Sequence, residues 1–272
     1  MHRIDGPGAT VDNKFTEGDP TAGVQATVVT AAWLNDIQEN LIAVLAAAGI
    51  TPVKGNSSQL LSAVKGRLLN VQIVTASGTV PKTPGANKWR VRGVGPGAGG
   101  GGTQVTSSGQ SAAGGGGSAG AYGEGIYDVS AITSVVAVIG SPGVGVAGAN
   151  GTNGATSSLG SLMTLPGGNG GVVGLAATTF AQQGGIGGAP SSAPSGANIV
   201  GTPGDAGSVG RLYQANSAEG GGGGKSPLGA TNSLGAVSGY GVGGAGQRAT
   251  ASSGAGTGLS GAPSIFIIEE YA

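Results

Sequence analysis

The sequence predicts a mainly β, glycine-rich protein in which β-strands are combined with polyglycine-II-like rods, preceded by a small N-terminal α-helical region. Three observations lead to this fold class. Glycine makes up 61 of the 272 residues, about three times its usual share. Glycine recurs at every third position in two stretches, and alternating or β-branched segments flank the glycine-rich part. The net charge of zero argues against disorder, which normally goes with high net charge and low hydrophobicity.

The glycine spacing is the basis of the rod prediction. Glycines lie three residues apart in GVAGANGTNG (145–154) and again in GTPGDAGSVG (201–210). A period of three is that of the extended, left-handed polyproline II helix, which has no internal hydrogen bonds. When such a helix is buried, its backbone groups must pair with neighbouring segments, and glycine lets those neighbours approach closely. We therefore expect a bundle of polyglycine-II-like rods joined by turns.

Composition divides the chain near residue 94. Residues 1–94 carry 15 of the 24 charged residues and 10 glycines, whereas residues 95–264 hold 51 glycines and seven charges. Residues 264–271 return to an ordinary strand pattern and are expected to close the glycine-rich domain. The expected parts are an extended N-terminal arm at 1–25, a helical region at 26–70, a strand connector at 71–94 and a glycine-rich distal domain at 95–272.

Two short amphipathic helices are expected in the helical region. Apolar residues at spacings of three and four follow one helical face from Trp33 onward, Gly49 ends this helix, and a second helix begins near Ser57 or Ser58. A helical hairpin of this size is too small for a good core of its own, so we expect its apolar stripe to pack on another copy or on a docking partner. The stripe comprises Trp33, Ile37, Leu41, Val44, Leu60, Val64 and Leu68.

Strands are expected on both sides of the first glycine tract. KWRVRGVG alternates, with Trp89 and Val91 on one face and Arg90 and Arg92 on the other. The β-branched segment 126–140 is the strongest strand signal within the glycine-rich part. It is a candidate partner for the C-terminal strand IFIIEEY.

Composition also excludes several kinds of partner and site. Balanced charge and a pI near 6.6 give no electrostatic footprint for nucleic acid or an anionic membrane. The lack of cysteine removes disulfides and thiolate sites, and His2 is the single histidine. No apolar run is long enough for a membrane helix, and the N-terminus lacks the apolar core of a signal peptide. We expect no nucleic acid, no membrane insertion and no metal.

Two glycine motifs are similar to nucleotide-binding loops but lack the elements that those loops need. Gly143, Gly145 and Gly148 spell G-x-G-x-x-G after a strand, yet no helix-forming sequence follows and no acidic residue occurs before Asp205. The run GGGGGKS has Glu219 where a Walker A loop has its first glycine. A polysaccharide depolymerase usually needs paired carboxylates, and charge is nearly absent here. We expect no cofactor, no catalytic residue and no enzymatic activity.

The order of these segments resembles that of bacteriophage tail fibre proteins. Residues 1–70 are similar to the N-terminal attachment segment of such fibres, with an HRID start, an FTEGDP arm and a helix containing WLNDIQENLIAVLAAAGI. Residues 72–104 are similar to the start of their glycine-rich distal domain. AYGEGIYDVS and PGVGVAGANG, within 121–151, are similar to the middle of that domain, and GAPSIFIIEEY (261–271) to its end. The resemblance covers nearly the whole chain.

The resemblance implies an elongated virion fibre and a homotrimer. Its N-terminal region would attach to phage tail or baseplate proteins. Its glycine-rich domain would bind a bacterial surface receptor, either lipopolysaccharide, an outer-membrane protein or a pilus. The protein would be made in the host cytoplasm without a signal peptide and would function in the virion, as part of the tail fibre. The alternative is a purely structural fibre or shaft protein without receptor contact.

Large side chains are scarce in the glycine-rich part and are therefore candidates for receptor contact. Aromatic rings provide a large, rigid contact area at low entropy cost, although they also fill gaps at the ends of a rod bundle. Tyr213 and Tyr240 lie in turn-rich surroundings, which favours them. The complete set of candidates is Tyr213, Tyr240, Arg248, Tyr122 and Phe180.

Overall fold

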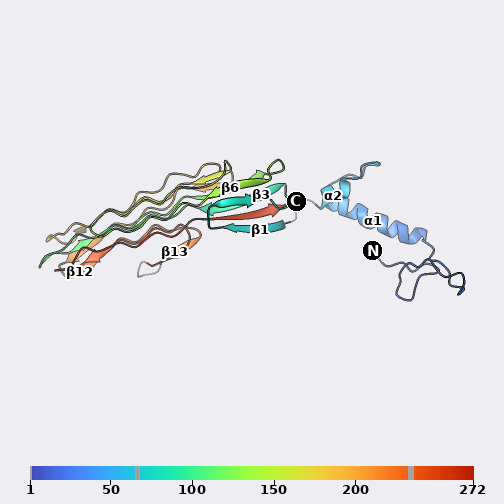
Figure 1. Ribbon diagram of the computed structural model, residues 1–272, viewed down its shortest axis with the longest axis horizontal. Helices are drawn as coiled ribbons and strands as arrows, with labels where there is room; N and C mark the ends of the chain where they lie inside the picture. Colours follow the sequence, from blue (N-terminus) through green and yellow to red (C-terminus); the bar gives the residue numbers. More distant parts are fainter. Residues whose placement is uncertain (1, 65, 67, 232–235) are drawn as a thin grey trace. The chain divides into compact units, whose positions relative to one another are not determined.

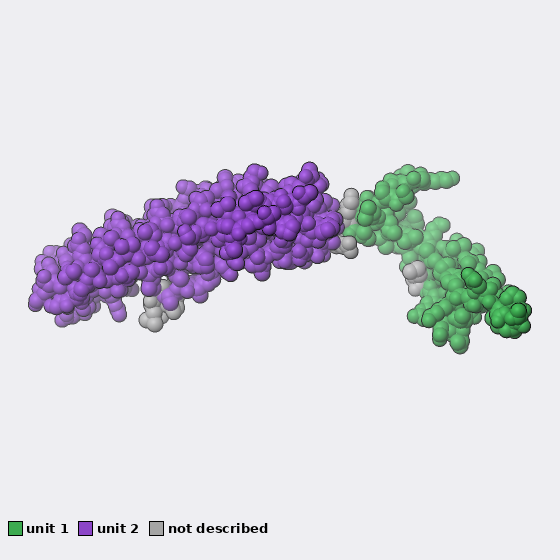
Figure 2. Space-filling model, viewed as in Figure 1, with its two compact units in different colours: residues 1–67 green, residues 68–272 purple. Residues whose placement is uncertain are grey.

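The computed structural model divides the chain into two compact units, residues 1–67 and residues 68–272 (Figure 2). The units are described separately below. Strands far outnumber helices in the described residues, which confirms the prediction of a mainly β protein with few helices. The described residues are 2–64, 66, 68–231 and 236–272.

Unit 1 holds the helices α1 (Ala31–Ala47) and α2 (Gln59–Ala63). The Thr30 hydroxyl caps α1 by accepting the backbone N–H of Trp33. Gly49 follows α1 with a φ of +70° and ends it, as predicted. The second helix was predicted to reach Leu68, and this was wrong. Gly66 has a φ of +86°, which no α-helix accommodates, and Leu68 is already the first residue of a strand.

The N-terminal arm is folded back on itself rather than extended, contrary to the prediction. Gly8 and Gly18 adopt φ angles of +76° and +74°, which turn the chain. The backbone N–H of Thr27 donates to Thr16, and the N–H of Val28 donates to Pro7. The arm therefore packs against the residues that lead into α1.

Unit 2 contains two antiparallel sheets that share one buried cluster (Figure 1). The first sheet has the strand order β1-β16-β3-β5-β10, and the second has the order β2-β6-β7-β8. Trp89 and Phe266 from the first sheet meet Leu159 and Met163 from the second in this cluster. The strands are β1 (Leu68–Val74), β2 (Gly78–Pro81), β3 (Lys88–Val94), β5 (Tyr122–Asp128), β6 (Ser134–Val138), β7 (Ser157–Leu159), β8 (Met163–Leu165), β10 (Val200–Thr202) and β16 (Ile265–Tyr271).

The alternation predicted for β3 is present, because Trp89 and Val91 are buried while Arg90 and Arg92 face outward. The pairing expected between segment 126–140 and the C-terminal strand is wrong. Strand β3 separates the two, because it pairs with β5 on one side and with β16 on the other. The segment itself divides after β5, where the Asp128 carboxylate accepts the backbone N–H of Ser130 in a tight turn, and β6 joins the second sheet.

Small strands lie at the end of unit 2 opposite β1 (Figure 1). The paired strands β13 (Gly229–Thr231) and β14 (Val237–Gly239) lie between this end and the two large sheets. The remaining strands are β4 (Ala112–Ala113), β9 (Gln182–Gln183), β11 (Arg211–Gln214), β12 (Ser217–Glu219), β13 (Gly229–Thr231), β14 (Val237–Gly239) and β15 (Arg248–Ala249).

Glycine-rich segments connect the large sheets to the small strands and are joined by backbone hydrogen bonds. Segment 95–103 is buried throughout. Its N–H groups donate to three neighbouring segments in turn, so that every third residue bonds to the same neighbour. The accepting carbonyls lie in residues 115–121, 256–262 and 149–152. Its own carbonyls accept from three further segments. These contain Gly143, residues 168–174 and residues 244–247.

Segment 111–121 is equally buried and is bonded in the same way. Its N–H groups reach three neighbouring segments, and its carbonyls accept from segment 95–103, from residues 185–188 and 221–224, and from Ala177. Each of the two central segments is thus surrounded by hydrogen-bonded neighbours. Outside β4, which pairs with β15, their N–H groups are satisfied without regular strand pairing.

One of the two predicted glycine triplet runs is continuous and the other is not. A Cβ atom placed on Gly204, Gly207 or Gly210 would lie 2.0–2.6 Å from successive carbonyl oxygens of segment 113–119. Gly148, in contrast, has a φ of +66° and lies in a turn. The run at 145–154 therefore divides into two neighbouring segments instead of forming one.

Candidate functional site

Three of the receptor-contact candidates lie at the end of unit 2 that carries the small strands. Tyr213 on β11 is 48% exposed, and its hydroxyl donates to the Glu219 carboxylate at 2.8 Å. Arg248 on β15 is exposed. Phe180 packs against the small cluster that contains Leu212. It is partly buried there, which fits the gap-filling role considered as the alternative for these aromatic residues.

The two other candidates lie elsewhere in unit 2. Tyr240 follows β14, is partly buried, and its backbone N–H donates to Leu228 at 3.0 Å. Tyr122 is the first residue of β5, and its ring is partly buried beside the sheet. The five candidates thus do not form a single site.

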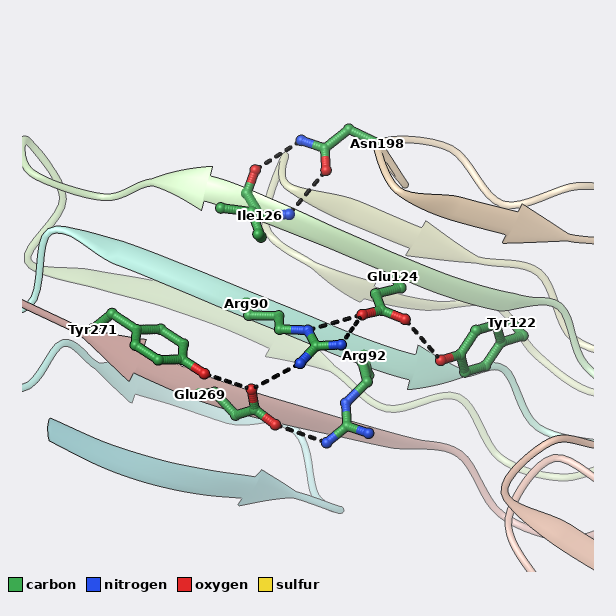
Figure 3. A network of polar contacts seen from close by, with 8 residues as sticks. All are labelled: Arg90, Arg92, Tyr122, Glu124, Ile126, Asn198, Glu269 and Tyr271. Carbon is green, nitrogen blue, oxygen red and sulfur yellow. Dashed lines mark hydrogen bonds and ion pairs between the residues drawn. The ribbon is translucent and has the colours of Figure 1, made fainter. Parts of the chain in front are cut away.

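The outer face of the five-stranded sheet carries an ion-pair network that the sequence analysis did not identify (Figure 3). Arg90 donates through Nε and Nη2 to Glu124 Oε1, at 2.8 and 2.6 Å. Arg92 donates to Glu269 Oε1 at 2.7 Å, and Arg90 Nη1 lies 3.5 Å from the other oxygen of Glu269. Each carboxylate also accepts a tyrosine hydroxyl. The network links β3, β5 and β16.

Glu269 is held ionised by its partners in the network. Burial on its own raises the pKa of Glu269, but the Tyr271 hydroxyl and the two arginines lower it by more, so its pKa lies below the ordinary value. The hydrogen bond to Glu124 raises the pKa of Arg90. Because these acids and bases neutralise one another, the network is suited to holding strands together and not to proton transfer.

Beside β5, the Asn198 side chain makes the pair of backbone hydrogen bonds that a residue of a neighbouring strand would make (Figure 3). Its Oδ1 accepts the backbone N–H of Ile126 at 2.8 Å, and its Nδ2 donates to the Ile126 carbonyl at 2.7 Å. The next residues form β10, which pairs with β5. Asn198 therefore fixes the start of the chain segment that leads into residues 202–205.

Glu270 is the one charged side chain among the fully buried residues of unit 2 that the structure describes. Its carboxylate accepts the Trp89 indole N–H at 2.8 Å and the backbone N–H of Thr83 at 3.0 Å. It also accepts the Thr83 hydroxyl and the amides of Gln72 and Asn70. Through these five donors, Glu270 ties β1, β3 and β16 to the loop after β2.

In unit 1, Trp33 is engaged by the arm. Its indole N–H donates to the His2 carbonyl at 3.3 Å, and its ring meets Phe15 edge-on with centroids 4.9 Å apart. The other stripe residues of the helices remain exposed or partly exposed, and Leu68 is exposed on β1. In the described part of α1, Leu45 is the buried residue.

The described residues contain no cluster of His, Cys, Asp or Glu that is arranged to hold a metal ion. Within the same residues, the helices are too short or too polar to cross a membrane.

Comparison with known proteins gives one partial likeness. No protein-family model matches the chain. Over 76 residues, the chain is 38% identical to the uncharacterized protein StfP of Escherichia coli (strain K12). The matched stretch covers 26% of this chain and 36% of StfP, so the chain spans little more than a third of the curated relative that it matches.

Proposed function

We propose that this chain is a tail fibre protein of a bacteriophage or prophage, which attaches through unit 1 and recognises a bacterial surface receptor through unit 2. The observation that carries the proposal is the 38% identity to StfP, because that name suggests a side tail fibre. The order of segments supports it independently, since the attachment-like helices precede the glycine-rich part and a terminal strand closes it.

The glycine-rich segments support an elongated fibre made of polyglycine-II-like rods. The N–H groups of segment 95–103 return to the same neighbour at every third residue, which is the period of that helix. Close approach of backbones, with no room for a Cβ atom at Gly100 or Gly116, is what such packing requires. A bundle of this kind is stiff and presents its turns and short strands at its end.

Unit 1 supports self-association and docking on other tail or baseplate proteins. Leu34, Ile37, Leu41 and Val44 follow one another at spacings of three, four and three, the pattern of a coiled-coil seam. Leu34 is 53% exposed and Leu41 is 45% exposed. A parallel homotrimer covers this seam, and Leu34 takes the place in it that the sequence analysis gave to Trp33.

The test is binding of the purified full-length chain to whole cells of a panel of Escherichia coli strains, together with its mass by light scattering. We expect saturable binding, displaced by unlabelled chain, from a particle near three times 25.4 kDa. Gly116→Ala, which disrupts the centre of unit 2, should abolish binding, and Gly222→Ala should leave it intact. A well-folded trimer that binds no strain would favour the purely structural fibre instead.

A further inference from the structure

A cavity of about 380 Å³ opens beside the start of β5, where the five-stranded sheet meets the glycine-rich segments. Three distant parts of the chain line it, and they contribute Tyr122, Thr202, Asp205 and Lys225. We call it the Tyr122 cavity. It is separate from the ion-pair network except for Tyr122, whose hydroxyl lies 3.3 Å from Glu124.

The two charged side chains that line the Tyr122 cavity, Asp205 and Lys225, make no polar interaction with other described residues. Asp205 and Lys225 are exposed, and among the described residues neither side chain has a hydrogen-bond or ion-pair partner. Elsewhere in unit 2, Glu124, Glu269 and Glu270 are all bonded. Residues 95–264 contain only seven charges, so the meeting of two free and opposite ones beside an aromatic ring is a distinctive feature.

The backbone that carries these two charges is fixed. The Asp205 carbonyl accepts the N–H of Ala119 at 2.9 Å, and the N–H of Gly224, next to Lys225, donates to Gly117 at 2.9 Å. A Cβ atom on Gly224 would lie 2.1 Å from the Asp205 carbonyl oxygen, so the two segments are in direct contact. Both are thus held against the central segment 111–121, and the cavity is formed before any ligand arrives.

The chemistry of the lining selects among ligand classes. A simple anion gains Lys225 but is repelled by Asp205, and a simple cation gains Asp205 but is repelled by Lys225. A purely apolar ligand would strip water from both charges without replacing it. A ligand rich in hydroxyl groups donates to the carboxylate and accepts from the ammonium, and the Thr202 hydroxyl serves either role. Its C–H surface has the Tyr122 ring to pack on.

We propose that the Tyr122 cavity binds a neutral sugar residue of a surface polysaccharide. This inference rests on the proposed function and deepens it, because it makes the receptor a glycan and places one contact beside the sheet instead of at the end with the small strands. A second cavity, lined by Leu175, Ile186 and Leu212, is apolar, and nothing in the structure indicates what covers it.

The direct test is saturation-transfer NMR of the full-length chain with the methyl glycosides of glucose, galactose, mannose and N-acetylglucosamine at millimolar concentrations. At least one sugar should give a saturable signal. Asp205→Asn and Lys225→Met should each weaken its affinity by roughly tenfold, because both remove a charged hydrogen-bonding group. Tyr122→Leu should also weaken it. Arg211→Met, which removes another exposed cation of unit 2 outside the cavity, should not.

Thermal unfolding of the Asp205 and Lys225 variants should match the wild type, because neither side chain has a partner to lose. Absence of binding by all four sugars overturns the proposal, as does binding that none of the cavity variants weakens. Cell binding separates this failure from that of the proposed function. If the Asp205→Asn/Lys225→Met double variant binds cells as well as the wild type, the cavity is the wrong site and receptor recognition stands. If the wild type itself binds no cells, the proposed function fails whatever the sugars do.

Discussion

Gly116→Ala is expected to destabilise unit 2 by about 3 kcal/mol or more, the upper part of the range for inserting atoms into a packed interior. A Cβ atom on Gly116 would lie 2.0 Å from the carbonyl oxygen of Gly222 and 2.4 Å from its carbonyl carbon. Gly116 is not among the glycines with positive φ, so the effect is steric and not conformational. Relieving this overlap would require moving segment 111–121, whose backbone is hydrogen-bonded to the neighbouring segments around it.

Gly222→Ala is the matched control, since it concerns the other partner of the same contact. Gly222 is exposed, and the nearest atom to a Cβ there is Ser208 Oγ at 3.4 Å, an ordinary contact distance. Its free energy of unfolding should change by no more than about 0.5 kcal/mol. Chemical denaturation of both variants measures the difference. Equal effects of the two substitutions would show that the segments do not approach each other as described.

Glu270→Gln is expected to cost about 3 kcal/mol, because a buried acceptor of charged hydrogen bonds is replaced by a group that is half donor. Both oxygens of the Glu270 carboxylate accept hydrogen bonds, whereas a glutamine amide would point its NH₂ group at some of these donors. The Trp89 indole and the Thr83 backbone N–H bond to Oε1, while the Thr83 hydroxyl, Gln72 and Asn70 bond to Oε2. Either orientation of the amide leaves donors facing donors.

The Glu270 carboxylate should also make the stability of unit 2 depend on pH. Burial raises the pKa of Glu270, but the hydrogen bonds from Thr83, Gln72 and Asn70 lower it by more, so its pKa in the folded state is below 4.5. A lowered pKa means that the stabilisation is fully present above the unfolded value and is lost as the pH falls through the folded value. The unfolding temperature should therefore be flat near neutral pH and fall below about pH 4.5, with a weaker fall in Glu270→Gln.

Glu219→Gln serves as the control for both measurements. Glu219 is exposed and bonds to the Tyr213 hydroxyl, so its loss should change stability by less than about 0.5 kcal/mol. If Glu270→Gln proved as harmless as Glu219→Gln, the donor cage around Glu270 would not be a determinant of the fold.

The elements that the sequence predicts well are those with a strong local period. Trp89 and Val91 alternate with two arginines, and β3 buries them as expected. The glycines at 204, 207 and 210 repeat against one neighbour. Gly148 breaks the other run because glycine serves a turn as well as a close backbone contact, and its spacing does not distinguish the two roles. Gly66 ended the second helix for the same reason.

The candidate site was less accessible from the sequence. Tyr122 stood out as a scarce aromatic residue, but Asp205 and Lys225 join it only through the packing of segments that are far apart in the chain. Nothing in the sequence neighbours of Phe180 indicates that it packs against Leu212. The buried position of Glu270 did have a signal. It shares a strand face with Phe266 and Ile268 in IFIIEEY, and a glutamate on an apolar face predicts a set of donors around it.

The central claim is that the glycine-rich part is a hydrogen-bonded scaffold and not a flexible linker, and amide hydrogen exchange followed by NMR tests it most directly. The amides of segments 95–103 and 111–121 should exchange as slowly as those of β3, because they are buried and bonded to neighbouring backbones. Amides of exposed turns, such as Gly109, should exchange fast. Rapid exchange throughout both central segments, with β3 still protected, would contradict the account.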